Sequence, residues 1–170
     1  IYQTRDPAEA IGRLELAMVP GKVAVPGLEK IKASVVAWAD DLVAKRNTQA
    51  YGQPYAPPAA DGWIWGSNSQ VLNNLQVIGS AYDLTGDAAY ADAFLSGLDY
   101  LFGRNALNIS YVTGYGTVYA KNQHSRMYAN QVESELPNPP AGTVVFEDSI
   151  KGRIEGAGRA SIQGDVRFCE

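Results

Sequence analysis

The residues best suited to chemistry lie in one polar and aromatic stretch, residues 99–126. The single histidine of the protein, His124, stands two places before Arg126. In an extended chain, residues two apart face the same side, so the imidazole and the guanidinium would meet one ligand together. An imidazole offers a donor and an acceptor, and a guanidinium offers a rigid fork of donors, which suits polyhydroxylated or anionic ligands. The alternative is a surface histidine near a solvated arginine.

Aromatic side chains supply a second kind of candidate. Trp65 lies in a Trp-Ile-Trp-Gly segment just before a helical pattern, and the loop after that helical region contains Tyr111, Tyr115 and Tyr119. Indole and phenol rings can accept the apolar C–H faces of sugar rings, and phenol hydroxyls add hydrogen bonds. The alternative is that one of Trp63 and Trp65 wedges the start of the helix and that the tyrosines brace long loops.

Several other kinds of site have no support in the sequence. It contains no Gly-x-Ser-x-Gly elbow, no phosphate-binding loop and no histidine pair at the spacing of metal ligands. The single cysteine, Cys169, excludes an internal disulfide and a cysteine-rich zinc site. The net charge of −4 gives no basic footprint for nucleic acid, and no apolar run has the length of a membrane span. We therefore expect neither nucleic acid nor membrane as a partner.

The elements that must position these residues have helical periodicity. Asp6-Pro7 is a good helix opening and predicts a short helix to about Leu16. The apolar spacing predicts a helix from Leu28 to near Arg46 or Asn47 and two more over about 67–85 and 87–103, and hence an all-α fold. The last two helices are separated by Thr85-Gly86-Asp87, in which Gly86 suits a left-handed C-terminal cap and Asp87 can cap the next helix. So short a connection makes the two helices an antiparallel hairpin.

Finer expectations concern the third helix and the chain around it. Ser67 or Asn68 is expected to cap this helix, and its buried stripe is expected to comprise Val71, Leu75, Ile78 and Tyr82. A Pro- and Tyr-rich loop precedes it, and residues 143–146 have the composition of a short strand. Tight turns at one end and long aromatic loops at the other are typical of a helical barrel whose active face is built from one set of loops.

Five separated blocks carry a resemblance to a known family. In chain order they are WGSNSQVLNN (65–74), AYDLTGD (81–87), DYLFGRNALNISYVTGYG (99–116), NQHSR (122–126) and LPNPPAG (136–142). They resemble the catalytic domain of glycoside hydrolase family 9, the cellulase family formerly called E. The resemblance implies that residues 1–146 form part of an (α/α)6 barrel, from the C-terminal half of such a domain. Residues 147–170 no longer match, and we expect a divergent, poorly ordered tail.

The resemblance also implies roles for individual residues. The family signature S-x-V-T-x-x-G, followed by H-x-R, falls on Ser110, Val112, Thr113, Gly116, His124 and Arg126. It implies that His124 is a catalytic residue in contact with the substrate, and that Arg126, Trp65 and Tyr115 bind the substrate. The implied activity is inverting hydrolysis of β-1,4-glucan, mostly cellulose, by a secreted, extracellular endoglucanase. No cofactor is required, although calcium is a possibility in the parent domain, and no metal ligand is assigned within this chain.

The sequence departs from the family in ways that limit this expectation. Ser125 stands where a second histidine is usual, and Gln123 where a proline is usual. The general base of the family is an Asp in an Asp-Ala-Gly-Asp motif and its general acid is a Glu in a segment resembling S-T-N-E, and neither motif occurs in these 170 residues. Inversion requires both carboxyl groups. The sequence shows no basic n-region followed by an apolar h-region, so no signal peptide is visible, and residues 1–5 carry no obvious start signal. We expect a piece truncated at both ends and inactive by itself, and the alternative is a non-catalytic glucan-binding fragment or pseudoenzyme.

Overall fold

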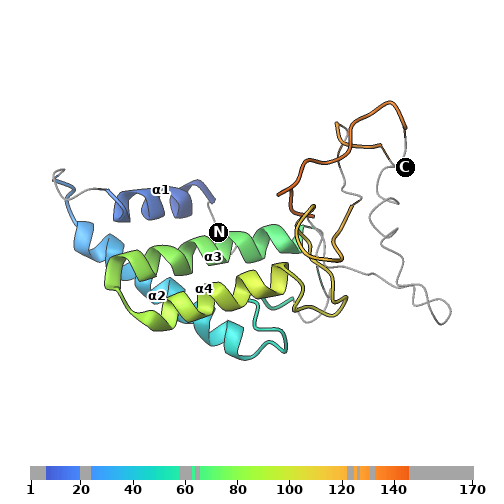
Figure 1. The fold of residues 1–170 in the computed structure, drawn as a ribbon. Helices are drawn as coiled ribbons and strands as arrows, with labels where there is room; N and C mark the ends of the chain where they lie inside the picture. Colours follow the sequence, from blue (N-terminus) through green and yellow to red (C-terminus); the bar gives the residue numbers. More distant parts are fainter. Residues whose placement is uncertain are drawn as a thin grey trace. The chain divides into compact units, whose positions relative to one another are not determined.

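A computed structural model describes residues 7–19, 24–57, 63, 66–121, 125, 127–130 and 133–145. These residues form four α-helices, α1 (Pro7–Ala17), α2 (Leu28–Asn47), α3 (Ser67–Thr85) and α4 (Ala88–Leu101) (Figure 1). The all-α prediction is confirmed, and the predicted helix bounds differ from the observed ones by at most two residues. None of the described helices combines the length and the apolar character that crossing a bilayer requires.

The chain divides into two compact units, which we describe separately. The first unit comprises Ile1–Ala56 and Gln70–Gly97, and the second comprises Pro57–Ser69 and Leu98–Glu170. The first unit therefore contains α1, α2 and most of α3 and α4. The second contains the loop that follows α4, which carries the expected site.

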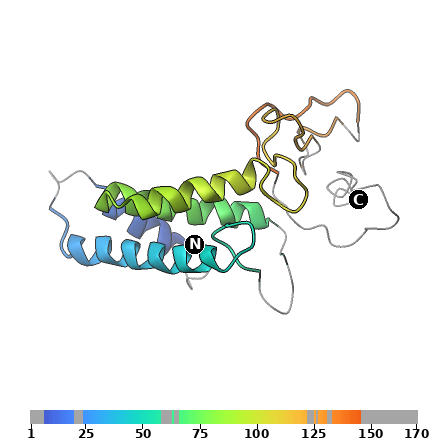
Figure 2. The same ribbon diagram turned by 60° about the horizontal axis from the view of Figure 1, so that its bottom comes forward.

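Helices α3 and α4 pack side by side as an antiparallel hairpin in the first unit (Figure 1, Figure 2). Two glycines lie at their contact. A Cβ on Gly97 would clash with the side chain of Leu75, and a Cβ on Gly79 would lie 3.4 Å from the ring of Phe94. The helices can approach this closely because each glycine removes a side chain from the contact.

The turn between α3 and α4 has the chemistry that its sequence predicts. Gly86 adopts φ 73, and its N–H donates to the carbonyl of Tyr82 at 2.7 Å. Oδ1 of Asp87 accepts the N–H of Ala89 at 2.9 Å. The left-handed cap at Gly86 and the N-terminal cap at Asp87 are both confirmed, and together they close the hairpin without a longer loop.

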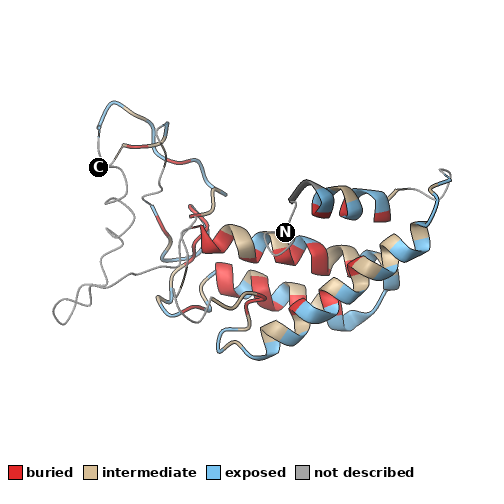
Figure 3. Cartoon of the chain, turned by 180° about the vertical axis from the view of Figure 1, so that it is seen from behind, coloured by how far each residue is buried: buried red, intermediate tan, exposed pale blue. Residues whose placement is uncertain are grey.

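The buried stripe of α3 is confirmed over most of its length. Val71, Leu75 and Ile78 are buried, and Figure 3 shows buried residues recurring along α3 and α4 between exposed ones. The prediction for Tyr82 is wrong, because this residue is 43% exposed. Tyr82 lies on the same face as Val71 but in the last turns of the helix, where the described chain does not cover it.

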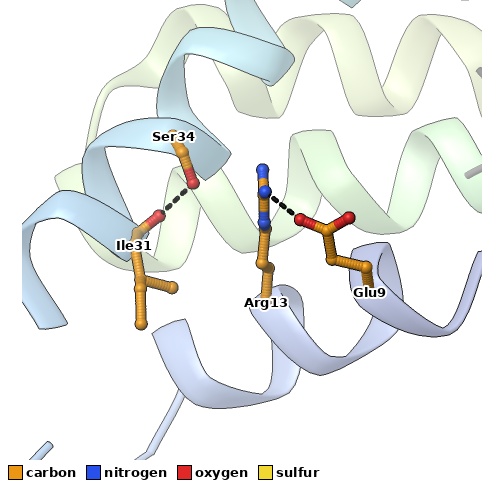
Figure 4. A network of polar contacts seen from close by, with 4 residues as sticks. All are labelled: Glu9, Arg13, Ile31 and Ser34. Atoms are coloured by element: carbon orange, nitrogen blue, oxygen red, sulfur yellow. Dashed lines mark hydrogen bonds and ion pairs between the residues drawn. The ribbon is translucent and has the colours of Figure 1, made fainter. Parts of the chain in front are cut away.

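Helix α1 packs against α2, and the side chains that it buries are small or apolar. On α1, Arg13 pairs with Glu9, and within α2 the Ser34 hydroxyl donates to the carbonyl of Ile31 at 2.7 Å (Figure 4). The ion pair is half exposed and contributes a few tenths of a kcal/mol at most. The buried side chains of α1 are those of Ala10, Leu14 and Ala17. Apolar burial therefore does more than charge pairing to hold α1 in place.

The loop that follows α2 is fastened to the hairpin by side chains. Asn74 Nδ2 donates to the Pro54 carbonyl at 2.8 Å, and the Ser96 hydroxyl donates to the Gly52 carbonyl at 3.2 Å. Arg46 Nε in turn donates to the Ser96 hydroxyl at 3.2 Å. Two loop carbonyls are satisfied in this way, which fixes a segment that has no secondary structure of its own.

Candidate functional site

The chain leaving α4 is shaped by one buried amide side chain. Asn105 Nδ2 donates to the carbonyls of Tyr100 and Ile109, both at 2.8 Å, and its Oδ1 accepts the N–H of Leu107 at 3.1 Å. Asn108 adopts the left-handed conformation with φ 52 in the same turn. Asn105 thereby ties the end of the helix to residue 109 and sets the starting point of the loop.

The residues of the S-x-V-T-x-x-G motif build the loop from inside. The Ser110 N–H donates to the Val118 carbonyl at 3.0 Å, and the Ala120 N–H donates to the Ser110 carbonyl at 2.8 Å. The Thr113 hydroxyl donates to the Ala120 carbonyl at 3.0 Å. Ser110, Val112 and Thr113 are all buried. Ser110 and Thr113 therefore hold the returning segment of the loop, residues 118–120, from inside.

Residues 141–145 close the loop from the other side. The Thr113 N–H donates to the Thr143 carbonyl at 2.9 Å, and the Gly142 N–H donates to the Thr113 carbonyl at 2.8 Å. A Cβ on Gly114, which has φ 79, would lie 2.8 Å from Ala141 Cβ and 3.2 Å from Ala141 Cα. Only glycine fits this contact without a shift of the backbone.

The strand predicted at residues 143–146 is reduced to an isolated antiparallel bridge between Val112 and Val144 in the described part of the chain. The Val145 N–H pairs with the Tyr111 carbonyl, but the Val145 carbonyl accepts from Asn68 Nδ2 at 2.9 Å. The Val145 carbonyl is thus bonded to the side chain of Asn68 and not to the backbone of a neighbouring strand. Of the two caps expected for α3, Ser67 or Asn68, the prediction for Asn68 is wrong: this residue lies inside the helix, its buried Oδ1 accepts no hydrogen bond, and its Nδ2 is aimed at Val145.

The aromatic residues of the second unit separate into core and surface. Tyr100 and Tyr111 are buried and meet edge to face with ring centres 5.8 Å apart. The ring of Trp63 stacks on that of Tyr100, with ring centres 6.4 Å apart and an angle of 9° between the ring planes. Trp63 therefore packs, as expected of at least one of the two tryptophans, and the buried ring of Tyr111 is not available to a ligand. Tyr115 is 52% exposed and meets the ring of Phe102 edge to face at 6.1 Å. Its ring remains accessible to a ligand.

Three of the four expected site residues, His124, Arg126 and Trp65, lie outside the described residues. Their roles stay predictions, as does the substrate contact of Tyr115. The tail at residues 147–170 is outside the described residues as well, so the predicted domain division is also untested. The described neighbour Ser125 accepts the N–H groups of Met127 at 3.2 Å and Tyr128 at 3.1 Å through its hydroxyl. The chain therefore turns directly after position 124.

A surface groove of about 500 Å³ opens in the same loop, and sequence reasoning missed it. Its lining residues are Phe102, Gly103, Arg104, Asn108, Ser110, Gly116, Thr117 and Val118. No periodicity indicates it, because its two walls come together only through the pairing of Ser110 with Val118 and Ala120. The one available signal was the large apolar side chain of Phe102 placed directly after the end of a helix.

Metal ligands do not cluster in the part of the chain that the structure describes. Its His, Cys, Asp and Glu residues form no group of three or more that could hold an ion. The expectation about calcium concerns the parent domain and stays untested.

Comparison with known proteins gives consistent relatives. The sequence matches the family described as Glycosyl hydrolase family 9 over residues 10–146. It is 52% identical to Endoglucanase C of Cellulomonas fimi over 135 residues, and these residues cover 79% of this chain and 12% of that protein. It is 36% identical over 148 residues to a cellulose 1,4-beta-cellobiosidase of Acetivibrio thermocellus, covering 82% of this chain and 16% of the relative. The chain thus spans less than a fifth of the length of either relative.

Solved structures agree with this family and with its fold. A thermostable endoglucanase from Alicyclobacillus acidocaldarius matches with a TM-score of 0.63 and 27% identity over 81% of this chain and 25% of that chain. A zinc-binding triple mutant of a family 9 endoglucanase matches with a TM-score of 0.67 and 24% identity, over 85% of this chain and 25% of that chain, and so supports the fold alone. The predicted fold class, part of an (α/α)6 barrel, is confirmed. With a match to the family over residues 10–146 and a relative of 52% identity, the chain belongs to glycosyl hydrolase family 9.

Proposed function

We propose that the chain forms part of the substrate cleft of an inverting β-1,4-glucanase that acts on cellulose or related β-glucans. The observation that carries this proposal is the family 9 match over residues 10–146, which includes the whole loop 102–121 and the positions of His124 and Arg126. Relatives named as an endoglucanase and as a cellulose 1,4-beta-cellobiosidase support the substrate class.

The geometry of the loop supports a role in positioning the sugar. Ala120 is anchored by its N–H to Ser110 and by its carbonyl to Thr113, four residues before His124. On the far side, the Ser125 hydroxyl closes a turn. We propose that these two fixed points hold His124 and Arg126 against the hydroxyl groups of one glucosyl unit, and that Tyr115 and Trp65 supply aromatic surface.

The proposal divides the chemistry between this chain and other parts of the protein. Inversion uses one carboxyl group to protonate the leaving oxygen and a second to activate water across the sugar ring. His124 and Arg126 offer hydrogen-bond donors for the substrate but cannot supply both functions. We propose that the Asp and Glu come from sequence beyond these residues, which agrees with coverage of only 12% and 16% of the relatives. The same proposal includes secretion of the parent protein. It requires no cofactor, and it allows a calcium site in the parent domain.

The test is an assay of the full-length protein that carries this chain on soluble carboxymethyl cellulose. We expect release of reducing ends, and we expect His124→Ala to lower the turnover roughly 10²-fold, as for the loss of one preorganised polar contact. Tyr82→Ala, which removes an exposed aromatic ring from the first unit, is the control and should retain activity. The absence of reducing-end release by the wild type would contradict the function, and cellohexaose binding without hydrolysis would support the non-catalytic alternative. Full activity of His124→Ala would contradict only the assigned residue.

A further inference from the structure

The groove of residues 102–118 has the size and the wall chemistry of a ligand site that the proposed function does not yet use. Its volume of about 500 Å³ lies within the range of small-molecule sites, roughly 300–1,000 Å³. One wall carries the ring of Phe102, which is 47% exposed and braced edge-on by Tyr115. A half-exposed phenylalanine ring is costly to leave in water, and it offers an apolar surface to a partner.

Polar groups on the other parts of the groove suit hydroxyl groups. Asn108 is exposed and its side chain has both a donor and an acceptor, and Thr117 adds a hydroxyl group. Arg104 is the charged residue of the lining, and the lining includes no carboxylate. Donors and acceptors mixed beside an aromatic ring match a neutral sugar, whose ring has apolar C–H faces and a rim of hydroxyl groups.

The groove is also formed in advance of any ligand. Its walls are joined by the bond from the Ser110 N–H to the Val118 carbonyl at 3.0 Å and by the bond from the Tyr111 N–H to the Leu101 carbonyl at 2.8 Å. Gly116 has φ 90, and a Cβ there would lie 3.4 Å from Ser110 Cβ, so the glycine leaves bare backbone at this wall. A rigid site loses little conformational entropy when it binds a ligand.

We propose that this groove is a binding subsite for one glucosyl unit of the β-glucan, with the sugar face on Phe102 and its hydroxyl groups on Asn108 and Thr117. The inference rests on the proposed function and deepens it, because it names residues that add affinity for the substrate. Since the groove residues act by binding, their loss raises KM and leaves kcat unchanged.

The experiment uses the full-length protein and a sulfur-linked cellohexaose, which binds without being cleaved. Phe102→Leu keeps apolar volume but removes the ring, and Asn108→Gly removes the amide while tolerating the left-handed backbone. Calorimetry should find each variant binding about three- to tenfold more weakly than the wild type, as for the loss of one aromatic or polar contact. Phe102→Tyr should retain the affinity, and Tyr82→Leu, at a ring of similar exposure, is the matched control.

The outcomes separate this inference from the function on which it rests. Wild-type affinity in both Phe102→Leu and Asn108→Gly, in a protein that still binds and cleaves β-glucan, would overturn the groove and leave the glucanase proposal intact. A weaker affinity in Phe102→Leu that accompanies a lower melting temperature, with no change in Asn108→Gly, would also overturn it, since the ring would then act through packing. A wild type that neither binds nor cleaves β-glucan would refute the proposed function itself, and the groove inference with it.

Discussion

Gly114 is the position where one added methyl group should disturb the loop most. It has φ 79, a conformation that costs a residue with a side chain about 1–2 kcal/mol. Its Cβ would also lie 2.8 Å from Ala141 Cβ and 3.2 Å from Ala141 Cα, so neither partner can rotate away. Overpacking of this kind costs about 1–3 kcal/mol. We expect Gly114→Ala to lower the free energy of unfolding by roughly 2–5 kcal/mol, from the sum of both effects.

A second substitution separates the two causes. Ala141→Gly in the Gly114→Ala background removes the Cβ–Cβ contact but leaves the backbone strain at Gly114. The double variant should therefore recover about 1–2 kcal/mol of the loss, which is a coupling energy between neighbouring residues. Gly12→Ala is the matched control, because Gly12 lies inside α1 with nothing within 4 Å of its added Cβ. It should stabilise the protein by up to about 1 kcal/mol.

The assay is thermal unfolding of the full-length protein together with hydrogen exchange of the loop. The amides of Thr113 and Gly142, which bond across the contact, should exchange faster in Gly114→Ala and more slowly again in the double variant. Unchanged stability and exchange in Gly114→Ala would refute the argument that Ala141 fixes this loop. A double variant no more stable than Gly114→Ala would assign the whole effect to the backbone conformation.

Three further substitutions test other contacts. Tyr90 donates to Asp40 at 2.6 Å, and this hydrogen bond, together with burial, raises the pKa of Tyr90 to about 12. The stabilisation is complete below pH 10 and is lost as the pH rises toward 12, so Tyr90→Phe should cost about 1 kcal/mol at pH 7 and remove this decline in pH-dependent unfolding. Asn105→Ala removes one buried and one partly buried hydrogen bond to the carbonyls of Tyr100 and Ile109 and should cost about 2–3 kcal/mol in chemical unfolding. Asn74→Ala should cost about 1–2 kcal/mol and speed exchange in the loop around Pro54, and an unchanged loop would contradict the anchoring role.

Local chemistry explains what the sequence predicted well. The hairpin of α3 and α4 depends on a helical apolar period and on a glycine followed by aspartate, and the capping bonds of Gly86 and Asp87 span only four and two residues. Family resemblance located the motif loop as well. Its buried members, Ser110 and Thr113, serve to shape the loop, a role that the motif itself does not reveal.

Contacts between distant parts of the chain explain what the sequence did not predict. Asn68 has the side chain of a helix cap, but it lies inside α3, and its Nδ2 donates to the carbonyl of Val145, 77 positions later. Among the described residues, the strand expected near Val144 is one bridge to Val112, and the Val145 carbonyl beside it accepts from Asn68. Tyr82 follows the periodicity of its helix and is nevertheless exposed, because periodicity identifies a face and does not say where along that face a partner lies. The groove beside Phe102 needed the pairing of the two loop walls, which no local pattern encodes.

The most direct test of the central claim is time-resolved proton NMR of cellohexaose during hydrolysis by the full-length protein that carries this chain. The account predicts cleavage of the β-1,4 bond with the new reducing end first appearing as the α-anomer, which then equilibrates. It also predicts that His124→Ala slows this signal roughly 10²-fold while Tyr82→Ala does not. An initial β-anomer, or no cleavage of cellohexaose at all, would contradict the account.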